Sequence, residues 1–175
     1  MTPFLSMVQA SNPVEKSLEM VVDVFASFYH GLTNKNQQRL KFLIVGADKS
    51  NTEKVTALAK NFEIGHTVEF VSAADASAKG YGAATVLVEA ATGEDDSFII
   101  DGLGHGLPVL TFITPARREI LDNSCAVMVK YRDYEANVNS LANALEIIYF
   151  DPEARKMLRR GALSKHATLT KQQTK

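Results

Sequence analysis

The chain has 175 residues, of which 46% are hydrophobic, and a formal net charge of −1. This length and composition suit one domain that buries about 70% of the surface exposed by the unfolded chain. The near-neutral charge gives no overall electrostatic reason to expect nucleic acid or an anionic membrane as a partner.

Cysteine content and hydropathy exclude further classes of protein. A single cysteine, Cys125, rules out an internal disulfide and a cysteine-based zinc site, and its apolar neighbours favour a packed, unreactive thiol. No apolar run approaches the roughly 20 residues that cross a bilayer, and the N-terminus lacks the pattern of a signal peptide. We therefore expect a cytoplasmic protein.

Strand and helix patterns alternate along the chain. In chain order, the sequence predicts a strand over Phe4–Ala10, a helix over Val14–Leu32, a strand over Lys41–Gly46, a helix over Asn51–Phe62, a strand over His66–Val71, a weak helix over Ala73–Ala83, a strand over Ala84–Ala90, a short helix beginning near Ser97, a strand over Pro108–Ile113, a helix over Ala116–Asn123, a strand over Ala126–Tyr131, and helices over Tyr134–Phe150 and Pro152–His166.

This alternation indicates an α/β fold, a Rossmann-like doubly wound parallel sheet of about six strands with helices on both faces. We expect the strand order 3-2-1-4-5-6. Residues 4–166 are assigned to one domain and residues 167–175 to a polar tail, and we expect the chain to be disordered from Lys165 onward.

A ligand site is expected where the strand order reverses. Ligands of such sheets bind outside the carboxyl ends of the strands at this switch point, which here brings the loop after the first strand opposite the loop after the fourth. Lys16 and the backbone amides near Ser97 and Phe98, at a helix N-terminus, could hold a diphosphate between them. Asp101 lies one turn further into that helix.

The run Phe98-Ile99-Ile100-Asp101-Gly102-Leu103-Gly104-His105-Gly106-Leu107-Pro108-Val109 resembles the C-terminal, nucleotide-sugar donor-binding domain of GT-B glycosyltransferases of the retaining group 1, family 4-like class. The resemblance extends from Phe4 to about His166. It includes Arg118–Asn123, which is similar to the family's Pro-Glu-Ile-Val-Glu-Asp segment.

The resemblance implies roles for individual residues. Lys16 matches a lysine that contacts the donor diphosphate, whereas Ser11 stands where the family has a second cation. Asp101 matches the acid that binds the nucleotide ribose. The family's sugar-binding acid lies eight positions earlier, at Gly93 here, so Glu94 takes that role only if the loop is one residue shorter.

The implied function is a glycosyltransferase donor domain that binds a nucleotide diphosphate-sugar for transfer to an acceptor, in polysaccharide or glycoconjugate synthesis. Lys16 would stabilise the departing nucleoside diphosphate electrostatically, with retention of configuration and with no cofactor or metal ion required. The acceptor site would lie in an N-terminal domain of the same enzyme. This chain would then be half an enzyme that binds the donor without turning it over.

Other functions stay open. A degenerate, non-catalytic interaction module would fit Ser11 and the altered acidic loop, and an epimerase of related fold would act without an acceptor. Glu94-Asp95-Asp96 resembles a metal-binding triplet but is interpreted as a hydrated loop. Arg155, Lys156, Arg159 and Arg160 form a cationic stripe, interpreted as a solvated helix face, with peripheral membrane contact of the full-length protein as the alternative.

Glycines and histidines near the expected site have structural interpretations. The spacing Gly102-x-Gly104-x-Gly106 closes a helix instead of opening one, which excludes a dinucleotide-binding loop. We expect Gly106 to end the helix and Gly102 and Gly104 to allow close helix–sheet packing. His66 and His105 have no partner at ligand or triad spacing, so packing or surface roles are expected.

Overall fold

The computed structural model describes residues 4–9, 17–76, 80–93 and 95–173. Six strands form one sheet in the order β3-β2-β1-β4-β5-β6, and every neighbouring pair is parallel. The strands are β1 (Phe4–Gln9), β2 (Leu40–Val45), β3 (Val68–Val71), β4 (Val86–Glu89), β5 (Val109–Phe112) and β6 (Ala126–Val129). The predicted strand order is confirmed.

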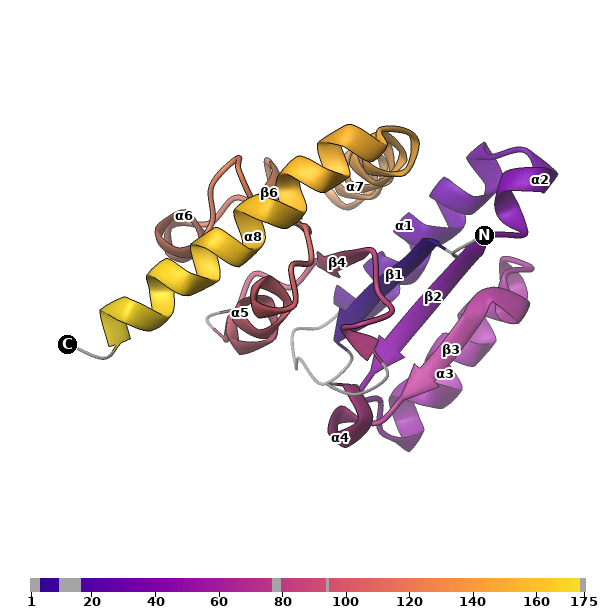
Figure 1. Cartoon of the computed structure of the whole chain (residues 1–175). Helices are drawn as coiled ribbons and strands as arrows, with labels where there is room; N and C mark the ends of the chain where they lie inside the picture. Colours follow the sequence, from indigo (N-terminus) through magenta and orange to yellow (C-terminus); the bar gives the residue numbers. More distant parts are fainter. Residues whose placement is uncertain (1–3, 10–16, 77–79, 94, 174–175) are drawn as a thin grey trace.

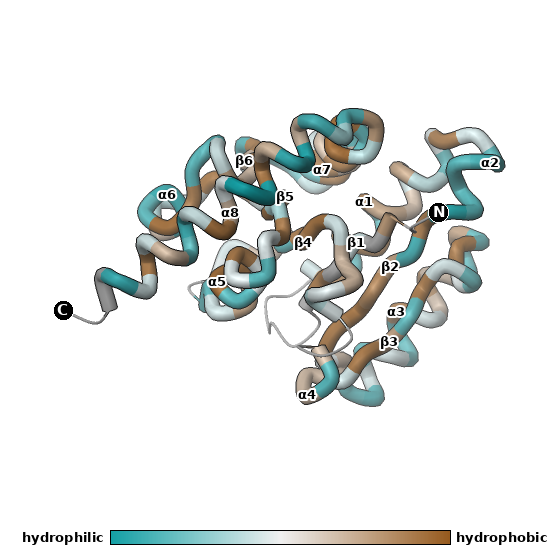
Figure 2. The backbone as a smooth tube through the Cα atoms, viewed as in Figure 1, coloured by the Kyte–Doolittle hydropathy of each residue, from teal (hydrophilic) through white to brown (hydrophobic). Residues whose placement is uncertain are grey.

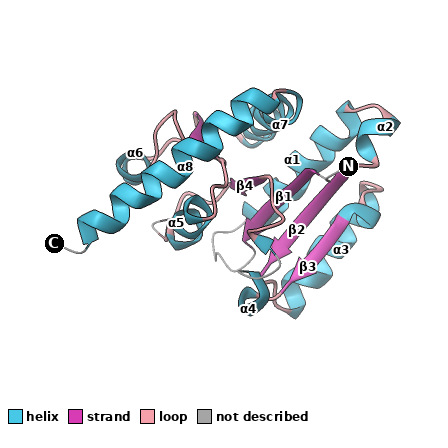
Figure 3. Ribbon diagram, in the orientation of Figure 1, coloured by secondary structure: helices cyan, strands magenta, loops and turns pink. Residues whose placement is uncertain are grey.

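Helices cover both faces of this sheet (Figures 1 and 3). They are α1 (Ser17–Gly31), α2 (Asn34–Gln37), α3 (Lys49–Asn61), the 3-10 turn η1 (Gly65–Thr67), α4 (Ala73–Asp75), α5 (Ser97–Gly104), α6 (Pro115–Ile120), α7 (Tyr134–Phe150) and α8 (Pro152–Gln173). Helices α1, α3 and α7 lie against one face, while α5 and the long α8 lie side by side on the other.

Side-chain alternation along the strands builds two separate cores. Phe42 and Ile44 of β2 point toward α1, where Phe42 stacks on Phe25 with ring centroids 4.6 Å apart, while Leu43 and Val45 point toward the opposite face. Both faces are covered, so the strands are largely apolar, as the mostly brown β2 in Figure 2 shows. No helix in the described part of the chain is both long and apolar enough to cross a membrane.

Polar caps fix several helix boundaries. The side chain of Asp48 accepts a hydrogen bond from Asn51 N, so α3 begins at Lys49, two residues before the predicted start. Thr114 caps α6 in the same way, and α6 ends at Ile120 because Leu121 is extended. Gly106 has a φ of +72° directly after α5, which confirms its predicted role in ending this helix.

Two predicted elements differ from the structure. The predicted helix over Ala73–Ala83 is α-helical only over Ala73–Asp75, and the turn that follows is wider, with Tyr81 N donating to Ala76 O, five residues back, at 2.9 Å, as in a π turn. Helix α8 continues to Gln173, so the expected disorder from Lys165 onward is wrong for residues 165–173. Leu169 packs against the core on the α5 side, which gives this last stretch an apolar contact.

Candidate functional site

The switch point lies between β1 and β4, which pair in parallel with Ser6 beside Val86. Their carboxyl ends therefore meet at one edge of the sheet, where the fold family of doubly wound sheets binds ligands. Lys16, Ser11 and Glu94 lie outside the described residues. The predicted pairing of Lys16 with the amide of Ser97, and the predicted role of Glu94, therefore stay predictions.

The N-terminus of α5 presents backbone amides at this edge. The first hydrogen bond within the helix runs from Ile100 N to Asp96 O at 2.9 Å, so the amides of Phe98 and Ile99 have no acceptor inside the helix. Ser97 N instead donates to Asp95 Oδ1 at 3.0 Å. Hydrogen bonds from the Ser97 hydroxyl and amide hold the pKa of Asp95 below its usual value. Asp95 thus occupies one of the predicted donors, while the amides of Phe98 and Ile99 have no acceptor among the described residues.

Three of the predicted site residues line one cavity of about 150 Å³: Ser97, Phe98 and Asp101. Asp101 is exposed, and Phe98 is buried. The remaining wall consists of apolar and aromatic residues from the ends of other elements, namely Val45, Ala73, Ala76 and Tyr81. Complete ligand pockets usually measure about 300–1,000 Å³, so this cavity has room for one part of a larger ligand.

Tyr81 forms an aromatic wall that the sequence analysis did not identify. Its ring stacks on His105 with centroids 4.7 Å apart and an interplanar angle of 15°, and it lies 5.8 Å from the ring of Phe98. Burial, together with the nearby charge of Asp101, raises the pKa of Tyr81 to about 12. His105 therefore has a packing role, as expected. The same holds for His66, whose Nε2 lies 3.1 Å from the hydroxyl of Tyr29.

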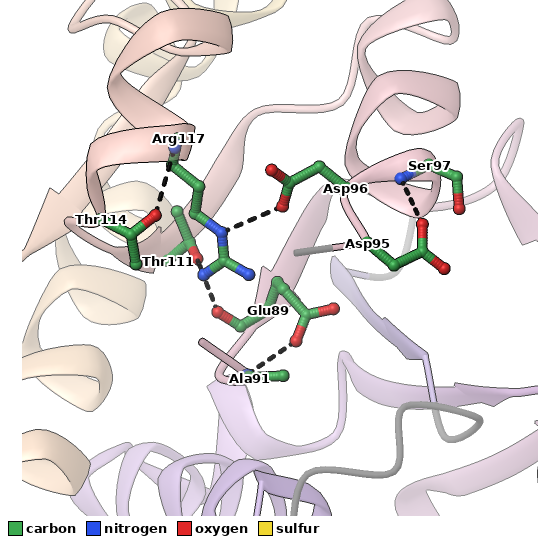
Figure 4. A network of polar contacts seen from close by, with 8 residues as sticks. All are labelled: Glu89, Ala91, Asp95, Asp96, Ser97, Thr111, Thr114 and Arg117. Atoms are coloured by element: carbon green, nitrogen blue, oxygen red, sulfur yellow. Dashed lines mark hydrogen bonds and ion pairs between the residues drawn. The ribbon is translucent and has the colours of Figure 1, made fainter. Parts of the chain in front are cut away.

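A buried network of polar contacts lies beside the start of α5 (Figure 4). The side chain of Arg117 has no exposed surface, and its Nε donates to Asp96 Oδ1 at 3.2 Å. Its Nη1 donates to the hydroxyl of Thr111, which in turn donates to Glu89 O at 2.7 Å. The network thus ties the residue before α5 to α6, β5 and β4.

Glu89 is an unusual residue at the end of an otherwise apolar strand. It is 3% exposed, and its Oε1 accepts a hydrogen bond from Ala91 N at 2.7 Å. Burial raises the pKa of Glu89 to about 7, against the opposing effects of the Ala91 amide and the Arg117 guanidinium; the charges of Asp96 and Asp95 add to the increase. Its protonation state therefore changes near neutral pH.

The sequence held one signal for this network. Glu89 is an acidic residue in the predicted strand Ala84–Ala90, and a charged side chain is rarely buried between the layers of a fold. Arg117 gave no such signal, because a short helix containing Pro115, Arg118 and Glu119 has the composition of a solvated helix. Arg117 is buried because its side chain reaches inward to Asp96 and Thr111.

Two further expectations are changed by contacts to α8. An added Cβ on Gly102 would come within 2.5 Å of Leu87 Cδ1, so Gly102 does allow close helix–sheet packing. An added Cβ on Gly104 would instead lie 3.0 Å from His166 Nε2 of α8, so the close packing at Gly104 is between helices.

The predicted solvated stripe on α8 does not include Arg155. This residue is half-buried, and its Nη1 donates to the carbonyls of Ile148 and Tyr149.

Comparisons with known proteins identify the fold. No protein-family model and no curated protein sequence matches the chain. Among solved structures, WaaG, a glycosyltransferase involved in lipopolysaccharide biosynthesis, matches 95% of this chain with 43% of its own length, at a TM-score of 0.78 and 21% identity.

Two other solved structures show the same likeness. The pneumococcal O-GlcNAc transferase GtfA, in complex with UDP and GlcNAc, matches 95% of this chain with 33% of its own length (TM-score 0.77, 17% identity). Sucrose-phosphate synthase from Thermosynechococcus elongatus matches 96% of this chain with 41% of its own length (TM-score 0.72, 20% identity). The chain spans less than half the length of each of these proteins, and it has the fold of the C-terminal half of GT-B group 1 glycosyltransferases.

Proposed function

We propose that this chain is the donor-binding half of a glycosyltransferase and that it binds a nucleoside diphosphate-sugar at the carboxyl edge of its sheet. The observation that carries the proposal is the meeting of three features at the switch point. These are the two amides at the start of α5 that have no acceptor among the described residues, the cavity beside them, and the exposed carboxylate of Asp101 in the wall of that cavity. GtfA, which has this fold, was solved with UDP.

The nucleoside would occupy the cavity itself. Its volume of about 150 Å³ suits one part of a nucleotide, and its wall offers the aromatic ring of Tyr81 beside small apolar side chains. Asp101 would accept hydrogen bonds from the ribose hydroxyls, because a carboxylate is a strong acceptor for paired hydroxyl donors. The resemblance in the sequence assigns the same role to Asp101.

The diphosphate would lie against the start of α5. The amides of Phe98 and Ile99 point along the positive end of the helix dipole, which favours an anion. Lys16 would supply the opposing cation and would stabilise the negative charge that develops on the departing nucleoside diphosphate. The acceptor would be held by an N-terminal domain, so the chain alone would bind the donor without transferring sugar.

Isothermal titration calorimetry with UDP and GDP tests the proposal. One of them should bind with a stoichiometry near one, and Asp101→Asn should weaken binding roughly tenfold, since a charge-assisted hydrogen bond contributes about 1.5–3 kcal/mol. Glu119→Gln removes the same charge from an exposed position on α6 and should leave the affinity unchanged.

The same titration separates the competing functions. No heat with either nucleotide at millimolar concentration would contradict the proposal and would favour a non-catalytic interaction module. Incubation of the chain with a UDP-sugar in the absence of an acceptor addresses the epimerase. Appearance of an epimeric UDP-sugar would contradict a donor-binding half that needs its partner domain.

A further inference from the structure

A second cavity lies at the opposite edge of the sheet, at the amino ends of the strands. It has a volume of about 550 Å³ and is lined by the first residue of β1, Phe4, by Arg39 just before β2, and by Thr85 just before β4. The end of α7 and the start of α8 close it with Tyr149, Phe150 and Arg155. This volume lies within the usual range for small-molecule sites, about 300–1,000 Å³.

Two arginines in this cavity have unused hydrogen-bond donors. Nε of Arg39 is buried and has no hydrogen-bond partner among the described residues. Leaving such a donor unsatisfied is unfavourable, because its hydration is lost and nothing replaces it. An acceptor bound in the cavity would satisfy this group.

Arg155 is held in place from behind. Its Nη1 donates to the carbonyls of Ile148 and Tyr149 at the end of α7, and its guanidinium carbon lies 5.9 Å from the centre of the Phe4 ring. These contacts use only one of its three nitrogens in hydrogen bonds. The guanidinium is therefore positioned in advance, with its remaining N–H groups available to a ligand.

The surroundings add positive charge. A neighbouring cavity of about 330 Å³ shares Thr85 and Arg155 with the first and is also lined by Lys156 and Arg159. None of the described residues that line the two cavities is acidic. Nζ of Lys156 forms an ion pair with Oε1 of Glu153 at 2.7 Å, which offsets part of its charge. Arg159 lies over Gly106 and has no acidic partner among the described residues.

We propose that this cavity binds a phosphorylated small molecule. Its phosphoryl group would accept hydrogen bonds from Arg39 and Arg155, and its organic part would lie against the rings of Tyr149 and Phe150. A doubly charged group with three acceptor oxygens matches two arginine forks better than a carboxylate does. The site is distinct from the switch point, because its residues lie at the other ends of the strands.

Nuclear magnetic resonance titration of the 175-residue chain with phenyl phosphate tests this proposal. The Nε–Hε resonances of Arg39 and Arg155 should shift and saturate, and Arg39→Gln should weaken the affinity about tenfold. Nε of Arg39 has no hydrogen-bond partner among the described residues, so this variant should keep its fold, which the same spectra verify. Arg118→Gln, with the same charge change on exposed α6, should bind as the parent does.

Two comparisons make the test decisive. Benzoate should bind at least tenfold more weakly than phenyl phosphate, and Arg39→Gln should weaken binding where Arg118→Gln does not. The proposal is overturned if the two arginine resonances do not move, if Arg39→Gln and Arg118→Gln have equal effects, or if benzoate binds equally well. Because neither phenyl phosphate nor benzoate is a nucleotide, failure here leaves the donor-binding proposal unaffected.

Discussion

Two buried ionisable side chains organise the site at the scale of single residues. Arg117 reaches Asp96, the residue before α5, and Thr111 on β5. Its Nη2 has no hydrogen-bond partner among the described residues, and the carboxyl of Glu89, which senses the Arg117 charge, accepts a hydrogen bond from Ala91 N. Since a buried cation is stable only when it is paired, the ion pair with Asp96 holds Arg117 and ties it to the residue before α5.

Glu89 should make the stability of the protein depend on pH. Its pKa is raised from 4.5 to about 7 in the folded protein, so the folded state binds more protons than the unfolded state between these values. The free energy of unfolding should therefore fall as pH rises from 4.5 to 7, by an amount on the order of 3 kcal/mol from this residue. Glu89→Gln should remove that part of the slope, as measured by urea unfolding at a series of pH values. An unchanged slope would contradict the burial of an ionisable Glu89.

At the scale of elements, Gly161 allows α8 to approach the segment before β6 closely. An added Cβ on Gly161 would lie 1.8 Å from the carbonyl oxygen of Ser124, in the segment before β6. Gly161→Ala should therefore lower the free energy of unfolding by roughly 2 kcal/mol or more, because the backbone clash outweighs the gain of about 1 kcal/mol in helix propensity.

The matched control is Gly31→Ala at the end of α1, where an added Cβ would meet nothing within 4 Å. This variant should be neutral or slightly stabilising in the same denaturation experiment. Equal effects of the two substitutions would show that α8 does not pack on the segment before β6 as closely as described.

The elements that the sequence predicted well are those whose patterns arise locally. Apolar runs such as Phe42–Val45 indicated the strands, and helical recurrence together with Pro152 gave the boundary between α7 and α8. The end of α8 was missed because residues 167–173 are polar on average, and their helix depends on one tertiary contact of Leu169. The helix predicted over Ala73–Ala83 is α-helical only over Ala73–Asp75, because the next turn closes an i→i+5 hydrogen bond from Tyr81 N to Ala76 O.

The candidate site was predictable only in part, for the same reason. Ser97, Phe98 and Asp101 share one helix, so their spacing alone placed them together at a switch point. Tyr81 joins them from a separate segment through packing on His105, and Arg117 is buried by reaching inward to Asp96 and Thr111. Neither arrangement has a local pattern in the sequence.

At the scale of the whole molecule, the two edges of the sheet have different chemistry. The carboxyl edge combines helix amides with the exposed carboxylate of Asp101, whereas the amino edge gathers arginines around aromatic rings. The matches to WaaG and GtfA include 95% of this chain but only 43% and 33% of the lengths of those two proteins. On the proposed function, a second domain would close over the carboxyl edge and leave the amino edge accessible.

The most direct test of donor binding is to map UDP on the chain by amide chemical shifts. The account predicts that the largest changes on adding UDP occur at Phe98, Ile99 and Asp101 of α5 and at Tyr81, with saturation at one equivalent. The arginines of the amino-edge cavity should shift little at that ratio. Changes confined to Arg39 and Arg155, or no saturable change in α5, would contradict a nucleotide site at the switch point.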